Sequence, residues 1–203
     1  MATGRGRLIV FEGIDGTGKS TQLQWAAIWL HARGYKVATL REPTRGPHGK
    51  VLRASAQAGR LTPEDERDLF LKDREWNVRV NLRPSLDAGK VVLLDRYYYS
   101  SIAYQGARGL DPQDIRRRNE AIAPRPDLVI LLDLPPEIAL RRIRDSRGET
   151  PNLFENLDYL RRVRALFLAL KDPAIVRIDA EPSAEIVWQQ VEAVLKSLFP
   201  PVK

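Results

Sequence analysis

Residues 13–21 combine glycines, a lysine and hydroxyl groups at a spacing that can hold a polyphosphate. The run Gly13-x-x-x-x-Gly18-Lys19-Ser20 matches the nucleotide phosphate-binding loop. Its glycines let several backbone N–H groups point at one anion, Lys19 brings a positive charge to the β- and γ-phosphates, and the Ser20 hydroxyl can bind Mg²⁺. The sequence therefore predicts an ATP site with Mg²⁺. The residues expected to bind ATP are Gly13, Asp15, Gly16, Thr17, Gly18, Lys19, Ser20 and Thr21.

The elements on either side of this loop are those that such a loop requires. An apolar run over 8–11 precedes it and predicts a buried strand. After it, Leu23, Ala26 and Leu30 recur at helical spacing until Gly34, which is a typical residue after a helix end. The unpaired N–H groups and the dipole at the start of that helix also favour phosphate.

A second chemical pair follows another apolar run. Asp95 and Arg96 come directly after 91–94, and the carboxyl ends of parallel strands line the ligand crevice of open sheets. A carboxylate there can hold Mg²⁺ or its water, and the arginine can bind phosphate oxygens; the alternative is an aspartate that caps a turn. Asp133 ends a similar run over 128–132, and because prolines follow it we favour a structural turn there.

Phe70 and Arg74 lie four residues apart on a helix predicted to begin at Thr62, so they share one face. An aromatic ring beside a guanidinium can stack on a base and clamp a phosphate. From the residues alone, the alternative is favoured: Phe70 belongs to the core and Arg74 faces solvent.

Four arginines crowd the end of a helix that begins at Pro136, and glycine and proline follow them. This segment, approximately 144–155, is predicted to form a lid over the transferring phosphate, with a solvated basic face as the alternative. The arginines are Arg141, Arg142, Arg144 and Arg147.

Strand and helix patterns alternate along the chain. The strands are apolar throughout, which is typical of a parallel sheet covered on both faces. We therefore predict one α/β domain over residues 1–203, with three α/β/α layers, a five-stranded parallel sheet and a helical lid segment. Pro84 is expected to bend or end the helix that it follows. The expected strands are 8–11, 36–40, 91–94, 128–132 and 174–178, and further helices are expected at 47–58, 62–82, 111–118, 154–170 and 182–198.

Composition narrows the class of protein. The chain has 203 residues, 43% of them hydrophobic, no cysteine and two histidines, which disfavours disulfides and thiolate or histidine-rich metal sites. No apolar run approaches the length of a membrane span and no apolar signal core begins the chain, so we expect a cytoplasmic protein without membrane contact. Trp25 and Trp29, four residues apart, form a second apolar face suited to burial or to a dimer contact.

The net charge of +7 is unevenly placed. Residues 1–60 hold ten Lys and Arg against three acids, and the remainder is neutral overall. A basic region around the phosphate loop suits a site that gathers several phosphates. The alternative is a nucleic-acid surface, as in a P-loop ATPase or end-kinase that binds DNA or RNA. A GTPase is disfavoured because an Asn-Lys-x-Asp motif is absent.

Taken together, these motifs make the chain similar to the bacterial thymidylate kinases, a family of P-loop nucleoside monophosphate kinases. The resemblance covers nearly the whole chain and implies transfer of phosphate from ATP to dTMP, Mg²⁺ as cofactor, a homodimer and no nucleic-acid partner. It depends on Phe11-Glu12-Gly13-Ile14-Asp15-Gly16-Thr17-Gly18-Lys19-Ser20-Thr21, Arg41-Glu42-Pro43, Phe70 with Arg74, Asp95-Arg96-Tyr97 with Ser100, and Ala103-Tyr104-Gln105-Gly106.

The resemblance also implies roles for single residues. Asp15 would hold the acceptor 3′-hydroxyl, Phe70 would stack on thymine, Arg74 and Arg96 would hold the acceptor phosphate, and Tyr104 would crowd the 2′ position. Ser101 and Gln105 would lie near the base. The implied substrate site comprises Asp15, Glu42, Pro43, Phe70, Arg74, Arg96, Ser101, Tyr104 and Gln105, the catalytic set Lys19, Arg96, Asp15, Arg144 and Arg147, and the metal site Ser20 and Asp95.

Two departures from the family pattern matter. The run 44–49 contains Arg45 and His48, which would stand close to the acceptor, so a kinase for another nucleoside monophosphate is an alternative. Some members carry an arginine in the phosphate loop where this chain has Gly16. This resembles the bacterial pattern in which lid arginines serve instead, here Arg144 or Arg147.

Overall fold

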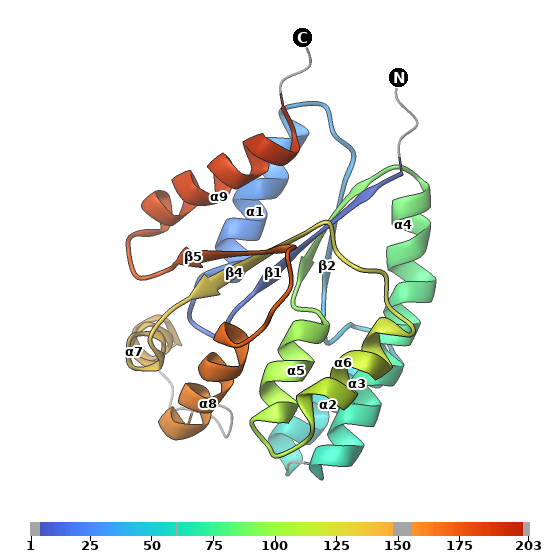
Figure 1. The fold of residues 1–203 in the computed structure, drawn as a ribbon, viewed down its shortest axis with the longest axis vertical. Coiled ribbons are helices and arrows are strands. Elements are labelled where there is room, and N and C mark those ends of the chain that lie inside the picture. The colour runs from blue at the N-terminus through green and yellow to red at the C-terminus, as the bar shows by residue number, and fades with distance from the viewer. Residues whose placement is uncertain (1–4, 60, 148–155, 201–203) are drawn as a thin grey trace.

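The computed structural model describes residues 5–59, 61–147 and 156–200 (Figure 1). Its centre is a five-stranded sheet in the order β2-β3-β1-β4-β5, in which every neighbouring pair is parallel. This confirms the predicted parallel sheet. The strands are β1 (Arg7–Glu12), β2 (Val37–Arg41), β3 (Val91–Asp95), β4 (Leu128–Asp133) and β5 (Ile175–Asp179).

The register of the central strands brings their carboxyl ends together. Phe11 of β1 lies beside Asp95 of β3 on one side and Ile130 of β4 on the other. Strands β3 and β4 are buried along their whole length, which is why their sequences are continuously apolar rather than alternating. The loop after β1 and the residues after β3 therefore start from adjacent points at one edge of the sheet.

Helices cover both faces of this sheet and complete the predicted three layers (Figure 1). Helices α1 and α9 lie side by side on one face, while α4, α5 and α8 lie on the other, as right-handed crossovers require for this strand order. The helices are α1 (Lys19–His31), α2 (Pro47–Ala58), α3 (Pro63–Asn77), α4 (Arg83–Asp87), α5 (Tyr98–Gly106), α6 (Pro112–Glu120), α7 (Pro136–Arg147), α8 (Leu157–Leu168) and α9 (Ala184–Leu198).

The helix predicted over 62–82 is interrupted before Pro84 by a change of helix type. Thr62 caps α3 by accepting a hydrogen bond from the Asp65 N–H, as expected. A wide π-helical turn, η1 (Val78–Leu82), then joins α3 to α4, so the chain stays helical through Pro84. A proline cannot donate to the carbonyl one turn earlier, and a local widening of the helix accommodates that loss.

Two other predicted boundaries differ from the structure. Sequence analysis assigned no element between 97 and 106, where the structure has α5. Helix α8 begins at Leu157, after the cap Asn156, rather than at 154. The lid residues 148–155 lie outside the described residues, whereas 144–147 belong to α7.

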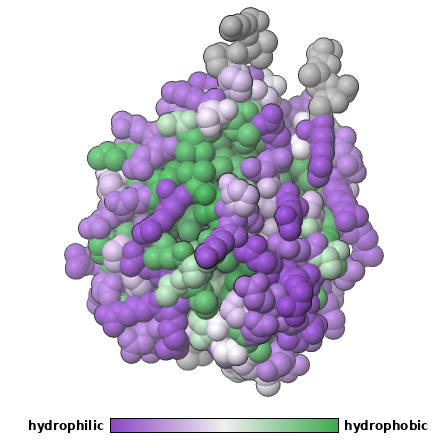
Figure 2. All heavy atoms as spheres, in the orientation of Figure 1, coloured by the Kyte–Doolittle hydropathy of each residue, from purple (hydrophilic) through white to green (hydrophobic). Residues whose placement is uncertain are grey.

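The two tryptophans of α1 pack against α9. The Trp25 ring meets the Trp188 ring edge-on, with 6.1 Å between centroids, and Trp29 Nε1 donates to Glu192 Oε1 at 2.8 Å. These contacts bury Trp29 and half-bury Trp25. Apolar side chains still gather over α1 and α9 on the face drawn in Figure 2, within a surface that is otherwise largely hydrophilic.

Within the described ranges, no helix has both the length and the apolar character needed to cross a bilayer.

Candidate functional site

The phosphate loop connects β1 to α1 and lies against the end of β4 and the first turns of α7. Gly13, Gly16 and Gly18 have φ angles of 135°, 84° and 85°, a region that side chains disfavour. A Cβ atom at Gly13 would lie 2.3 Å from the Leu132 carbonyl oxygen, and one at Gly16 would lie 2.6 Å from that of Ala139. Gly13 and Gly16 are therefore required by both backbone conformation and close packing, whereas Gly18, where a Cβ atom would meet nothing within 4 Å, is required by conformation alone.

Lys19 is buried at the base of this loop, at the first position of α1. Its Nζ donates to the Ile14 carbonyl oxygen at 2.8 Å and lies 3.9 Å from Asp15 Oδ1. Burial lowers the pKa of Lys19 to about 8, and the nearby charge of Arg96 adds to this effect. A polyphosphate beside Nζ would stabilise the charged form.

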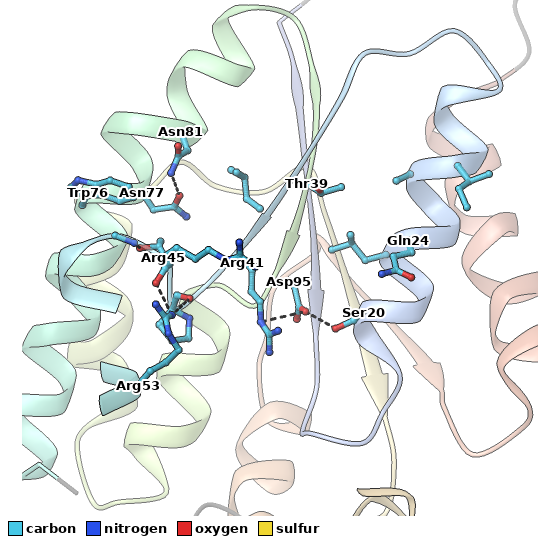
Figure 3. Close-up of a pocket in the computed structure, with 17 residues that line it drawn as sticks. Ser20, Gln24, Thr39, Arg41, Arg45, Arg53, Trp76, Asn77, Asn81 and Asp95 are labelled. Carbon is cyan, nitrogen blue, oxygen red and sulfur yellow. Dashed lines mark hydrogen bonds and ion pairs between the residues drawn. The ribbon is translucent and has the colours of Figure 1, made fainter. Parts of the chain in front are cut away.

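Ser20 and Asp95 face each other across the start of α1 and the end of β3 (Figure 3). Ser20 Oγ donates to Asp95 Oδ2 at 2.9 Å, and Arg41 Nε lies 3.8 Å from the same oxygen. Asp95 Oδ1 is buried and has no hydrogen-bond partner in the part of the chain that the structure describes. A hydroxyl and a carboxylate with a spare oxygen are a donor set that Mg²⁺ accepts, with phosphate oxygens and water as its remaining ligands.

Arg96 joins the phosphate loop to α5. It has a φ of 68°, which is uncommon for a residue with a side chain, and its N–H donates to the Phe11 carbonyl oxygen at 3.0 Å. Its Nη2 donates to Asp15 Oδ1 at 2.7 Å, and its Nη1 donates to Ser100 Oγ at 3.1 Å. The Tyr104 ring centroid lies 5.1 Å from the guanidinium carbon. The guanidinium is thus held between the loop and the helix.

The buried carboxylate of Glu12 fixes this arrangement, a role that sequence analysis missed. Oε1 accepts from the backbone N–H groups of Tyr97 at 2.8 Å and Ser100 at 3.1 Å, and Oε2 accepts from Ser100 Oγ at 2.6 Å. Burial raises the pKa of Glu12 to about 7, against the opposing effect of these hydrogen bonds and of Arg96. The sequence did carry a signal for this role, because Glu12 is an acid at the end of an apolar strand, directly before the loop.

Arg74 is buried rather than solvated, contrary to the alternative favoured from the residues alone. Its Nε and Nη2 both donate to Glu42 Oε2, at 2.9 and 2.7 Å, and its Nη1 donates to Ser101 Oγ at 3.1 Å and to Asn119 Oδ1. Asn77 Nδ2 in turn donates to Glu42 Oε1 at 3.0 Å. Asn77 continues the helix stripe of Phe70 and Arg74, as the helical spacing predicts, whereas sequence analysis did not anticipate Asn119.

A cavity of about 220 Å³ lies between α3, α5 and the loop after β2, and all residues of the predicted substrate site line it. Phe70 is half-buried at its wall, so it is not a core residue. Residues that sequence analysis missed also contribute, among them Glu66 and Tyr97. The predicted residues on this wall are Asp15, Glu42, Pro43, Phe70, Arg74, Arg96, Ser101, Tyr104 and Gln105.

A larger groove of about 1330 Å³ runs between α1, β2 and α3, on the other side of the 41–46 segment (Figure 3). Arg45 lines this groove and not the cavity that holds Phe70, and His48 lines neither. The two residues that motivated a different acceptor are therefore not on the wall of the predicted acceptor site.

The arginines of α7 have different surroundings. Arg142 donates to the carbonyl oxygens of Ala180 and Glu181, both at 2.8 Å, so it holds the loop after β5. Arg144 is exposed, and the side chain of Arg147 lies outside the described residues. Asp133 accepts hydrogen bonds from Arg164 at 2.7 and 3.0 Å, which supports its structural interpretation.

Comparison with known proteins gives consistent matches over most of the chain. A family model described as thymidylate kinase matches residues 11–191. A protein of Archaeoglobus fulgidus named probable thymidylate kinase is 50% identical over 192 residues, which cover 95% of this chain and 96% of that protein. Proteins named thymidylate kinase from Akkermansia muciniphila and Xanthomonas campestris are 48% and 49% identical, covering 98% and 94% of this chain and 95% and 83% of their own lengths.

Replacing Glu12 with glutamine should remove a pH dependence of folding stability. The pKa of this carboxyl is about 7 when folded and 4.5 ordinarily, so the folded state keeps its proton to higher pH. The free energy of unfolding of the wild type should therefore fall between pH 4.5 and 7, by about 3 kcal/mol at most. Urea denaturation of both proteins from pH 4 to 8 measures this; a wild-type-minus-variant difference that stays constant would contradict it.

Proposed function

Because the chain belongs to the thymidylate kinase family, we propose that it transfers the γ-phosphoryl group of ATP to dTMP, giving ADP and dTDP. One observation carries the assignment to particular residues. Asp15 of the phosphate loop and Arg96 of the cavity wall form an ion pair at 2.7 Å, which places the donor loop and the acceptor cavity next to each other. A phosphate bound at the loop and a phosphate bound in the cavity would meet beside the Asp15–Arg96 ion pair.

We assign the donor site to the phosphate loop. The loop N–H groups and the α1 N-terminus would hold the ATP phosphates, and the Lys19 ammonium would lie beside the β- and γ-phosphates. The nucleotide-binding residues are those expected from the sequence: Gly13, Asp15, Gly16, Thr17, Gly18, Lys19, Ser20 and Thr21.

We place dTMP in the smaller cavity. Phe70 would stack on thymine, Tyr104 would crowd the 2′ position, and Asp15 would hold the 3′-hydroxyl. Ser101 and Gln105 stand on the α5 wall, where the base would lie. Glu42 and Pro43 close the cavity at the end of β2.

The two arginines of this cavity are not equivalent. Arg74 already uses four of its five N–H groups within the protein, and Glu42 balances its charge. It can therefore give one hydrogen bond to the acceptor, but it cannot grip a phosphate with two. Arg96 is also paired with a carboxylate, Asp15, but it uses three of its five N–H groups within the protein and so keeps two for a phosphate. We therefore propose that Arg96, beside the loop, neutralises most of the charge of the acceptor phosphate.

Mg²⁺ would be held by Ser20 and Asp95, whose buried and unpartnered Oδ1 suits a metal-bound water or the ion itself. When bound, Mg²⁺ neutralises charge on the β- and γ-phosphates. The described residues hold no cluster of three or more His, Cys, Asp or Glu side chains. We propose that phosphate oxygens of the nucleotide and water supply the other ligands.

No strong general base is needed for this transfer. The attacking group is an acceptor phosphate oxygen, which is largely ionised near neutral pH because the second phosphate pKa is about 6. Catalysis then depends on alignment and on neutralising charge on the transferring group. Lys19 and Arg96 supply positive charge, and we propose that Arg144 or Arg147 supplies more from a lid over about 144–155.

Beyond the site, we expect a cytoplasmic homodimer without a nucleic-acid partner, in which residues 1–203 act as one domain. The basic residues of 1–60 are divided between the two ends of the sheet. Lys19 and Arg41 lie at the phosphate-loop end, whereas Arg7 and Lys36 lie at the start of β1 and just before β2, at the opposite end.

Lys19→Ala should lower kcat by orders of magnitude while leaving the fold intact, because the variant loses the charge at the β- and γ-phosphates. Steady-state kinetics with ATP and dTMP, together with circular dichroism, measure both effects. Near-normal turnover in a folded variant would remove Lys19 from the mechanism.

Asp95→Asn should raise the Mg²⁺ concentration needed for half-maximal activity by roughly tenfold or more, because the neutral amide binds the cation and its water more weakly. A Mg²⁺ titration at saturating ATP and dTMP measures this. Asp114→Asn removes a half-buried carboxylate of α6 that lines neither the groove nor the cavity, so it is the matched control and should leave the titration unchanged. An unaltered midpoint in Asp95→Asn would remove the carboxylate from the metal site.

The alternative, a kinase for another nucleoside monophosphate, is tested by a panel of monophosphates in an ADP-release assay. The position of Arg45 outside the acceptor cavity predicts that dTMP gives the highest kcat/KM. Equal or better rates with a purine monophosphate would overturn the dTMP assignment.

A further inference from the structure

Three side chains form a polar chain behind the wall of the acceptor cavity. Gln105 Nε2 donates to Glu66 Oε1 at 3.0 Å, and Arg108 Nη1 donates to Glu66 Oε2 at 2.6 Å. Arg108 Nη2 is held in turn by the Leu61 carbonyl oxygen at 2.7 Å. Glu66 and Gln105 are both more than nine-tenths buried, and both line the cavity beside Phe70.

This chain determines which end of the Gln105 amide is available. The Glu66 carboxylate, paired with Arg108, can only accept hydrogen bonds, so the amide NH₂ must face it. The other end, Oε1, is buried and has no hydrogen-bond partner among the described residues. A buried carbonyl oxygen left without a donor is costly, and such groups in a binding site are usually satisfied by the ligand.

We infer that Glu66 and Arg108 are positioning residues that make the cavity select a pyrimidine with an N–H group at position 3. The inference rests on the proposed dTMP kinase activity, since it concerns the base in the same cavity. Glu66 fixes the amide, Gln105 Oε1 accepts from the base, and Arg108 holds the Glu66 carboxylate in place.

The selectivity follows from hydrogen-bond polarity. Thymine and uracil carry an N–H at position 3, whereas cytosine has a lone pair there. Cytosine would therefore place an acceptor against Gln105 Oε1, and both atoms would be desolvated without a partner. Sites that leave buried polar groups unpaired reject such an analogue strongly. If the amide were turned over, its NH₂ would face the base and the preference would be reversed.

Glu66→Gln tests this directly. Arg108 would bind the new amide oxygen, so the new NH₂ would face Gln105 and turn the Gln105 amide over. We expect kcat/KM for dTMP and dUMP to fall by roughly tenfold to a hundredfold, mainly through KM, and that for dCMP to rise. The KM for ATP should not change. Comparing dUMP with dTMP separates recognition of position 3 from recognition of the methyl group.

The exchange Glu66→Gln with Gln105→Glu supplies the rescue. It keeps one carboxylate on this wall, and a glutamate at 105 can accept both from the new amide and from the base. The preference for dTMP over dCMP should return. Should Glu66→Gln be too unstable to assay, the double variant tests the same claim alone. Asp114→Asn, which alters exposed pairs with Arg117 and Arg118, is the control and should keep the wild-type ratio.

The outcomes separate this inference from the proposed function. A wild type without dTMP kinase activity would overturn the function itself. A wild type that prefers dTMP, with a folded Glu66→Gln variant that has the same dTMP-to-dCMP ratio, would overturn the role of Glu66 and leave the function standing. Equal losses with all substrates would show a purely structural pair and also overturn the inference.

Discussion

The buried carboxylate of Glu12 ties the two halves of the site together. It ends β1, directly before the phosphate loop, and accepts three hydrogen bonds from the first turn of α5. Pairing of β1 with β3 brings Phe11 beside Asp95, and the carboxylate then sets where α5 begins relative to the loop. Arg96, between these contacts, is held in an uncommon backbone conformation. The donors on each oxygen offset part of the cost of burying this carboxylate, and burial still raises its pKa to about 7.

Other buried acids hold polar side chains in the same way in the cavity lined by Phe70 and Arg74. Glu12 orients Ser100, which accepts from Arg96; Glu42 holds the guanidinium of Arg74; and Glu66 turns the amide of Gln105. In each case a buried acid fixes a polar group on the cavity wall. A buried carboxylate accepts but cannot donate when ionised, so it leaves its partner one orientation. The cavity therefore presents a defined order of donors and acceptors before any ligand enters.

Local patterns predicted the sheet and the phosphate loop because the information is local. The strands are apolar runs, and the loop glycines must adopt positive φ wherever the fold places them. The cavity could not be predicted from local patterns, because its residues come from α3, α5 and the end of β2. Only tertiary packing shows that Arg74 is buried and that Glu12 reaches α5. Helix α5 was missed because Tyr97–Tyr99 and Ser100 are weak helix formers; their packing stabilises it. Pro84 indicated a disturbance of the helix, but it did not indicate that the disturbance would be a π turn.

The packing of α7 against the phosphate loop determines whether the loop itself could carry an arginine. Gly16 has a φ of 84°, and a Cβ atom there would lie 2.6 Å from the Ala139 carbonyl oxygen and 3.1 Å from its Cα. The backbone of α7 thus fills the space that any longer side chain at this position would need, and a helix backbone cannot yield as a flexible side chain can. An arginine in the loop is excluded while α7 stays in place. The same helix carries Arg144, one of the two arginines that we propose as the source of further positive charge at the transferring group.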